Sequence, residues 1–131
     1  IPTNFGECVL LEEFSLPENK MTGTIPSELG RLVNLRLLDL YGRSATDTVG
    51  FSGSIPMELS NCISLDTLGI SRNSLTGDLD PIFCTNRTDS WRIFQSDCLS
   101  ERPYFLSELT CSCCTHCCGD NCRCCKINTN P

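Results

Sequence analysis

Cysteine is the residue type with the clearest chemical potential in this chain. Twelve cysteines occur in 131 residues, and ten of them lie between residues 84 and 125. Thiols at this density either oxidise to disulfides in the secretory pathway or, under reducing conditions, bind a soft metal ion. The ten are Cys84, Cys98, Cys111, Cys113, Cys114, Cys117, Cys118, Cys122, Cys124 and Cys125.

The neighbourhood of this cluster favours disulfides over metal. Asn86-Arg87-Thr88 is an N-glycosylation sequon at the edge of the cluster, which indicates an extracellular, oxidising route. Ten cysteines allow five bridges, whose connectivity the sequence does not fix. We therefore expect disulfides among the ten, a glycan on Asn86 and no metal ligand, and keep a thiolate metal-binding tail as the weaker alternative.

The sequence contains few of the motifs that catalysis would require. Cys114-Thr115-His116-Cys117 has the spacing of a redox Cys-x-x-Cys motif, but it lies in the cysteine cluster. His116 is the single histidine, and there is no nucleophile elbow from which a hydrolytic triad could be built. Asp78 and Asp80 have the pattern of solvated surface carboxylates rather than an acid/base pair. We expect no enzymatic activity, no catalytic residue and no cofactor.

A repeat of 24 residues precedes the cysteine cluster and must position whatever site the chain carries. Leu11 to Leu35 is 24 residues, and Leu35 to Leu65 is 30. The longer interval indicates an insertion at about residues 43–50. The first full repeat reads Leu11-x-x-Phe14-x-Leu16-x-x-Asn19-x-Met21-x-Gly23-x-Ile25-Pro26.

This pattern predicts an α/β-type solenoid. Leu-x-x-Leu-x-Leu directs apolar side chains inward from a short strand, and strands of successive repeats pair into a parallel, concave sheet. We expect repeats over residues 1–83, with a partial repeat at 1–8 followed by three full ones. A disulfide-rich cap follows at 84–131. Because the chain begins within a repeat, we expect it to be the C-terminal part of a larger protein.

Residues 1–83 resemble the plant-type leucine-rich repeat, Leu-x-x-Leu-x-Leu-x-x-Asn-x-Leu-x-Gly-x-Ile-Pro. Arg43 departs from the pattern because it occupies the position of the asparagine, beside the insertion. The cysteine run at 111–118 is similar to the cap of leucine-rich-repeat proteins from diatoms and other stramenopiles. The resemblance implies an extracellular recognition domain.

Two patterns in the cap can be placed on this framework. Leu106-x-x-Leu109-x-Cys111-x-x-Cys114 has the spacing of the repeat strand, so residues 106–114 are predicted to pair with the third repeat. Trp91 and Phe94, three residues apart, fit one face of a short helix or a core formed by a loop, and the spacing does not separate the two. Both aromatic side chains should be buried.

Cys8 and Cys62 lie outside the cluster and share one register. Each stands three residues before the first strand leucine of its repeat, where Leu32 is the intermediate member. Two repeats separate them, a distance of roughly 9–10 Å at one strand spacing per repeat, which is beyond the reach of a disulfide. We predict that both are buried thiols that take no part in bridges.

The candidate binding residues come from the concave face, where solenoids usually bind ligands. A net charge of −6 disfavours nucleic acid and anionic membranes as partners, and no apolar run is long enough to span a bilayer. An ordinary solvated face remains an equal interpretation, and the insertion near Ser44–Gly50 is a second candidate site. The predicted ligand-binding residues are Glu13, Glu18, Leu37, Asp39, Tyr41 and Arg72.

Two functions fit these features. The first is an extracellular recognition domain that binds a protein, a peptide or a glycan. The second is a structural subunit of an extracellular matrix, coat or filament, since an open repeat edge invites packing against more chain.

Overall fold

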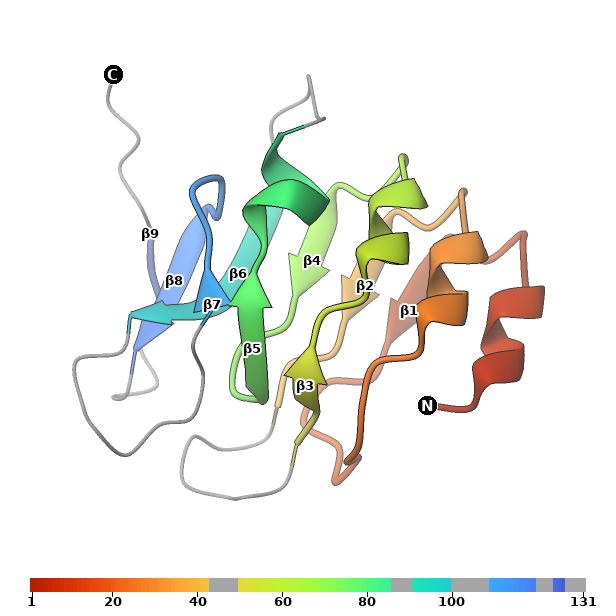
Figure 1. The fold of residues 1–131 in the computed structure, drawn as a ribbon, viewed down its shortest axis with the longest axis horizontal. Coiled ribbons are helices and arrows are strands. Elements are labelled where there is room, and N and C mark those ends of the chain that lie inside the picture. Colours follow the sequence, from red (N-terminus) through yellow and green to blue (C-terminus); the bar gives the residue numbers. More distant parts are fainter. Residues whose placement is uncertain (43–49, 86–90, 100–108, 120–123, 127–131) are drawn as a thin grey trace.

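The chain forms a series of stacked coils that progress along its long axis (Figure 1). The computed structural model describes residues 1–42, 50–85, 91–99, 109–119 and 124–126. Each of the first coils contains a short 3-10 helix, a tight turn and a three-residue strand. The helices are η1 (Thr3–Glu7), η2 (Ser27–Arg31) and η3 (Met57–Asn61), and a short π-helix, η4 (Asp80–Cys84), follows them.

One sheet runs the whole length of the molecule in the order β1-β2-β4-β6-β8-β9. Its strands are parallel except for the last, which runs antiparallel to β8. Phe14, Leu38, Leu68 and Phe94 are direct partners across the first four strands. The strands are β1 (Glu13–Ser15), β2 (Leu37–Asp39), β4 (Thr67–Gly69), β6 (Ile93–Leu99), β8 (His116–Gly119) and β9 (Cys124–Lys126).

A second, smaller sheet has the order β3-β5-β7, and its strands are also parallel. They are β3 (Ser52–Ser54), β5 (Ser74–Asp78) and β7 (Leu109–Thr110). The 3-10 helices are each preceded by a proline in extended conformation: Pro2, Pro26 and Pro56. Proline favours such a helix start because its fixed φ suits the first turn and its missing N–H is not needed there.

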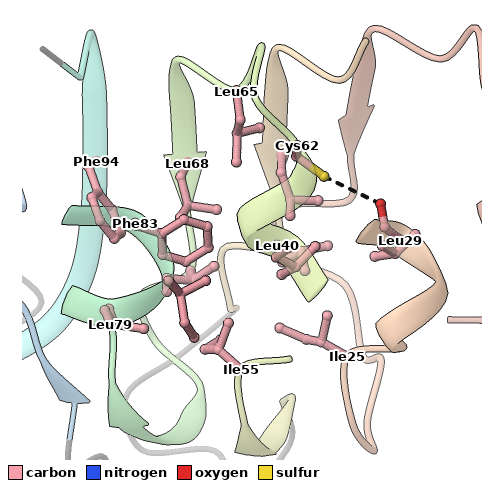
Figure 2. Packing of buried hydrophobic residues seen from close by; sticks show 14 of the residues in the cluster. Ile25, Leu29, Leu40, Ile55, Cys62, Leu65, Leu68, Leu79, Phe83 and Phe94 are labelled. Atoms are coloured by element: carbon pink, nitrogen blue, oxygen red, sulfur yellow. Dashed lines mark hydrogen bonds between the residues drawn. The ribbon is translucent and has the colours of Figure 1, made fainter. Parts of the chain in front are cut away.

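A continuous hydrophobic core fills the space between these layers (Figure 2). Leu38 and Leu68 enter the core from the strands of the six-stranded sheet, which is called the concave sheet below. Leu29 and Leu59 enter the core from the 3-10 helices. Cys62 joins this packing, with its Sγ 3.4 Å from the carbonyl oxygen of Leu29 in the preceding coil. The apolar residues with exposure of 0% are Leu29, Leu32, Leu35, Leu38, Leu65, Leu68, Leu75, Leu79 and Phe94.

Asn73 links the second and third repeats. Its Nδ2 donates to the carbonyl oxygens of Leu40 (2.9 Å) and Ile70 (3.0 Å), and its Oδ1 accepts from Phe51 N–H (2.9 Å). Leu40 and Phe51 lie on either side of the insertion, so one side chain fixes both of its ends. Arg43 and residues 44–49 of the insertion lie outside the described residues.

Trp91 and Phe94 are buried as predicted, but neither the helix nor the loop offered for them is correct for Phe94. Phe94 lies in β6, paired with Leu68 of the third repeat, and Trp91 precedes the strand. Thr115 fixes the other side of the strand, because its N–H donates to Phe94 O and its hydroxyl accepts from Phe94 N–H. The two aromatic rings pack edge-on against Phe83 of η4.

The prediction that residues 106–114 supply the next repeat strand is wrong, although part of the segment does pair with the third repeat. Leu109–Thr110 forms β7, which pairs with β5, whereas the concave strand β4 pairs with β6. Asp78 explains this choice in part, since its Oδ1 accepts from the hydroxyl of Thr110 (2.9 Å). Residues 106–108 lie outside the described residues.

The predicted burial of Cys8 is wrong. Cys8 is an exposed thiol, whereas Cys62, at the same register, is 1% exposed. The register position is buried only where a coil packs on each side of it. Among the described residues, the coil of Cys8 packs through η1 against η2, whereas η3, which precedes Cys62, packs against both η2 and η4.

Candidate ligand-binding groove

A groove of about 520 Å³ crosses the concave sheet. It is built by side chains that alternate with the buried leucines, since successive residues of a strand point to opposite faces. Leu37, Asp39 and Thr67 are half-buried, and Leu38 and Leu68 between them are fully buried. The residues that line the groove are Pro17, Glu18, Leu37, Asp39, Tyr41, Thr67, Gly69, Ile93 and Gln95.

Tyr41 and Arg72 form a stacked pair beside this groove. The Arg72 guanidinium carbon lies 4.8 Å from the centroid of the Tyr41 ring, which is a cation–π geometry. Arg72 lies in the turn after β4 and adopts a left-handed backbone conformation with φ of 58°. Tyr41 N–H also donates to Asp39 Oδ1 (3.1 Å). These contacts place an aromatic ring, a cation and a carboxylate close together.

A carboxyl group supports the turn that carries Arg72. Asp97 Oδ2 accepts from Asn73 N–H (3.1 Å). Burial raises the pKa of Asp97 to about 6, while hydrogen bonds from the backbone of Arg72 and Asn73 and the charge of Arg72 act in the opposite direction. The Asp97 carboxyl therefore gains or loses its proton as the pH passes through about 6.

The structure gathers most of the predicted binding residues. Glu18, Leu37, Asp39 and Tyr41 line the groove, and Arg72 stacks on Tyr41 at its side. Glu13 is exposed on β1 but does not line it.

Sequence reasoning missed Ile93 and Gln95, which β6 contributes to the groove. The signal was present, because Trp91-x-x-Phe94-x-Ser96 keeps the spacing of Leu-x-x-Leu-x-Leu. Two aromatic residues and a serine replaced the leucines and concealed the fourth strand.

Comparison with known proteins agrees with this architecture. No family model matches the chain. A probable LRR receptor-like serine/threonine-protein kinase of Arabidopsis thaliana is 44% identical over 68 residues, which cover 49% of this chain and 6% of that protein. The solved plant peptide hormone receptor RGFR1, in complex with RGF2, has 38% identity and a TM-score of 0.54 over 64% of this chain and 13% of its own.

Two further solved structures extend the likeness into the cap. The Arabidopsis receptor kinase HAESA, in complex with the peptide hormone IDA and the co-receptor SERK1, has 29% identity and a TM-score of 0.56. The match covers 83% of this chain and 16% of HAESA. A plant ice-binding protein, 23% identical, has a TM-score of 0.58 over 83% of this chain and 30% of its own, and shows the fold alone.

The fold is a plant-type leucine-rich-repeat solenoid. The chain spans only a small part, 6%, of the length of the curated relative that it matches. Within the described residues, none of the helices is both long and apolar enough to cross a membrane.

Among the described residues, two disulfides lie at the C-terminal end of the leucine-rich-repeat solenoid. Cys84 of η4 is bridged to Cys113, and Cys111 is bridged to Cys114. The first bond ties the third repeat to the cap, and the second closes the turn between β7 and β8. The sulfur atoms of Cys84, Cys111 and Cys113 lie within 4.8 Å of one another. Because these sulfurs are bridged, they are not the thiolates that a soft metal ion requires.

The predicted glycan on Asn86 and the disulfides predicted for the other cysteines of the cluster involve side chains that the structure does not describe. Asn86 and Cys122 lie outside the described residues, and the side chains of five further cysteines are also outside them. Those five are Cys98, Cys117, Cys118, Cys124 and Cys125.

Proposed function

We propose that this chain is an extracellular recognition domain whose concave groove binds a peptide segment of a protein partner. The observation that carries the proposal is the groove itself, which combines apolar side chains with two carboxylates on a rigid sheet. Backbone pairing fixes the strands on both sides, so the binding groups need little reorganisation. The similarity to RGFR1 and HAESA, both solved with peptide hormones, supports a peptide ligand.

The groove suggests the chemistry of the peptide. Leu37, Tyr41 and Ile93 offer apolar contacts, and Ile93 is 38% exposed. Glu18 and Asp39 supply negative charge, in a chain whose net charge is −6. Complementarity therefore favours a peptide with an apolar side chain next to a basic one. A groove with this combination of apolar and acidic side chains is better suited to a peptide ligand than to a glycan.

The extracellular location rests on the disulfides and on the relatives. Disulfides persist in oxidising compartments and are rare in the cytosol. Membership of a larger protein, the glycan on Asn86 and the stramenopile-type cap are further parts of this proposal. All the groove residues have positioning or recognition roles, and none is assigned to catalysis.

Selection from a library of random twelve-residue peptides, displayed on phage, tests the proposal. The purified, oxidised chain should enrich peptides that pair an apolar residue with Lys or Arg. Tyr41→Ala should weaken binding of an enriched synthetic peptide by about tenfold, because it removes an aromatic anchor and the partner of Arg72. Met57→Ala, which truncates a side chain 55% exposed on η3, should leave binding unchanged and serves as the control.

Two results would contradict this function. Enriched peptides that bind Tyr41→Ala as well as the unaltered chain would remove the groove from recognition. Failure to enrich any peptide, together with concentration-dependent polymers in sedimentation, would instead favour the structural-subunit alternative.

A further inference from the structure

The two disulfides of the cap lie side by side but have different surroundings. Cys84, Cys111 and Cys113 are partly exposed, whereas Cys114 is 1% exposed. An external thiol can therefore reach either sulfur of the Cys84–Cys113 bond but only the Cys111 end of the other bond. The groups that contact each bond decide which one reacts.

Ser96 favours opening of the Cys111–Cys114 bond. Its hydroxyl oxygen is fully buried and lies 3.1 Å from Cys114 Sγ. A disulfide sulfur carries no hydrogen, so the serine hydroxyl is the donor in this contact. A thiolate left on Cys114 would accept the same hydrogen bond more strongly, because hydrogen bonds to charged groups exceed those to neutral ones. Ser96 thus makes the buried Cys114 a better leaving group than a buried thiol without such a donor.

Asp80 opposes opening of the Cys84–Cys113 bond. Its Oδ1 lies 3.2 Å from Cys84 Sγ and also accepts from Ser112 N–H (2.6 Å), which holds the carboxylate in place. Attack at Cys84 would bring an anionic thiolate against this carboxylate. Attack at Cys113 would leave the negative charge on Cys84, again beside Asp80. Like charges disfavour both routes.

We propose that Cys111 is a site of S-thiolation by a small extracellular thiol of the glutathione class. The thiolate sulfur of the small molecule attacks Cys111 Sγ and forms a new S–S bond with it. The Cys111–Cys114 bond breaks, and its electron pair moves to Cys114 Sγ, where Ser96 donates to the new thiolate. One disulfide replaces another, so the step needs no additional oxidant or reductant.

The exchange has a defined structural consequence. The Cys111–Cys114 bond closes the turn that joins β7 in the second sheet to β8 in the concave sheet. After exchange, β8 keeps its connection to β6 through the bonds between Thr115 and Phe94. On the other side, β7 stays paired with β5 and Cys113 stays bridged to Cys84, so the modification opens only the turn between β7 and β8 and leaves both sheets intact. It acts independently of the peptide-binding groove.

Thiol titration of the folded chain tests the proposal. The oxidised protein is incubated with reduced glutathione, quenched with acid, unfolded, labelled with N-ethylmaleimide and mapped by peptide mass spectrometry. We expect glutathione on Cys111 and maleimide on Cys114 while Cys84–Cys113 is still intact. If Cys84 or Cys113 is modified first, or if both bonds open at the same rate, the proposal is overturned.

Two variants separate the proposed chemistry from simple loosening of the cap. Ser96→Ala should slow exchange at Cys111 about fivefold, because the leaving thiolate loses its donor. Asp80→Asn should speed exchange at Cys84–Cys113 and leave the Cys111 rate unchanged. The two bonds are followed in the same molecules, so each is a control for the other. An unchanged Cys111 rate in Ser96→Ala, or faster opening of both bonds, would reject the role of Ser96.

Discussion

Single side chains connect successive coils in this molecule. Asn73 is the clearest case, because its amide bonds backbone groups on both sides of the insertion as well as in its own turn. Backbone polar groups at a turn between coils need partners when neighbouring coils cover them. The turn of Asn19 is different, since its amide has a 3.3 Å contact with Pro17 O at an exposed position.

Asn73→Ala should lower the free energy of unfolding by about 2–4 kcal/mol, because several partly buried backbone groups lose their partner together. Asn19→Ala is the matched control and should change it by less than about 0.5 kcal/mol. Guanidinium unfolding of the oxidised variants, followed by circular dichroism, measures both. Equal losses in the two variants would show that the inter-coil bonds of Asn73 do not stabilise the solenoid.

Asp97 should make the stability of the fold depend on pH. Burial raises its pKa in the folded state from 3.8 to about 6, so the folded chain binds the proton more tightly than the unfolded chain. The contribution of Asp97 is therefore most favourable below about pH 4 and is lost as the pH rises through 6. By linkage the change is of the order of 1–3 kcal/mol.

The comparison of Asp97→Asn with the unaltered chain isolates this effect. The substitution keeps an oxygen acceptor for Asn73 N–H and removes the titration. Thermal unfolding midpoints measured from pH 4.5 to 7.5 should fall more steeply with rising pH in the unaltered chain than in the variant. Parallel curves would mean that another group controls the pH dependence.

The 3-10 helices of successive coils approach one another closely. A Cβ atom on Gly30 would lie 2.3 Å from the Glu58 carbonyl oxygen of the next helix, and Gly6 meets Glu28 in the same way. Such distances leave no room for any side chain without movement of the backbone. Glycine at this position therefore sets the spacing between coils.

Gly30→Ala should destabilise the chain by about 2–3 kcal/mol, through overpacking between η2 and η3. Ser27→Ala changes an exposed residue of the same helix and should be nearly neutral. Unfolding in guanidinium again gives both values. A neutral Gly30→Ala would show that the coils can separate at little cost.

Sequence reasoning recovered the elements whose spacing is regular. The leucine pattern predicted β1, β2 and β4 in their observed register, because alternation on a strand admits one register with the apolar face inward. It did not recover β6, where Phe94 and Ser96 occupy positions held by Leu68 and Ile70. Aromatic side chains three residues apart suit a helix equally well, so only the neighbouring strands decide between the two structures.

At the scale of the whole molecule, the sequence located the face that we propose for binding but not the extent of its groove. The place of Asp39 and Tyr41 on the concave face could be predicted, since they alternate with buried leucines. The contributions of Ile93 and Gln95, and the stacking of Arg72 on Tyr41, depend on packing between coils. The exposed position of Cys8 depends in the same way on the coils that flank it.

The central claim is that recognition takes place on the concave sheet. Its most direct test is photo-crosslinking with an enriched peptide that carries a benzophenone side chain, followed by mass-spectrometric mapping of the attached residues. We expect crosslinks within residues 37–41, 67–69 and 93–95, the segments that contribute side chains to the groove. Crosslinks concentrated on η1, η2 or η3, or on the β3-β5-β7 sheet, would contradict it.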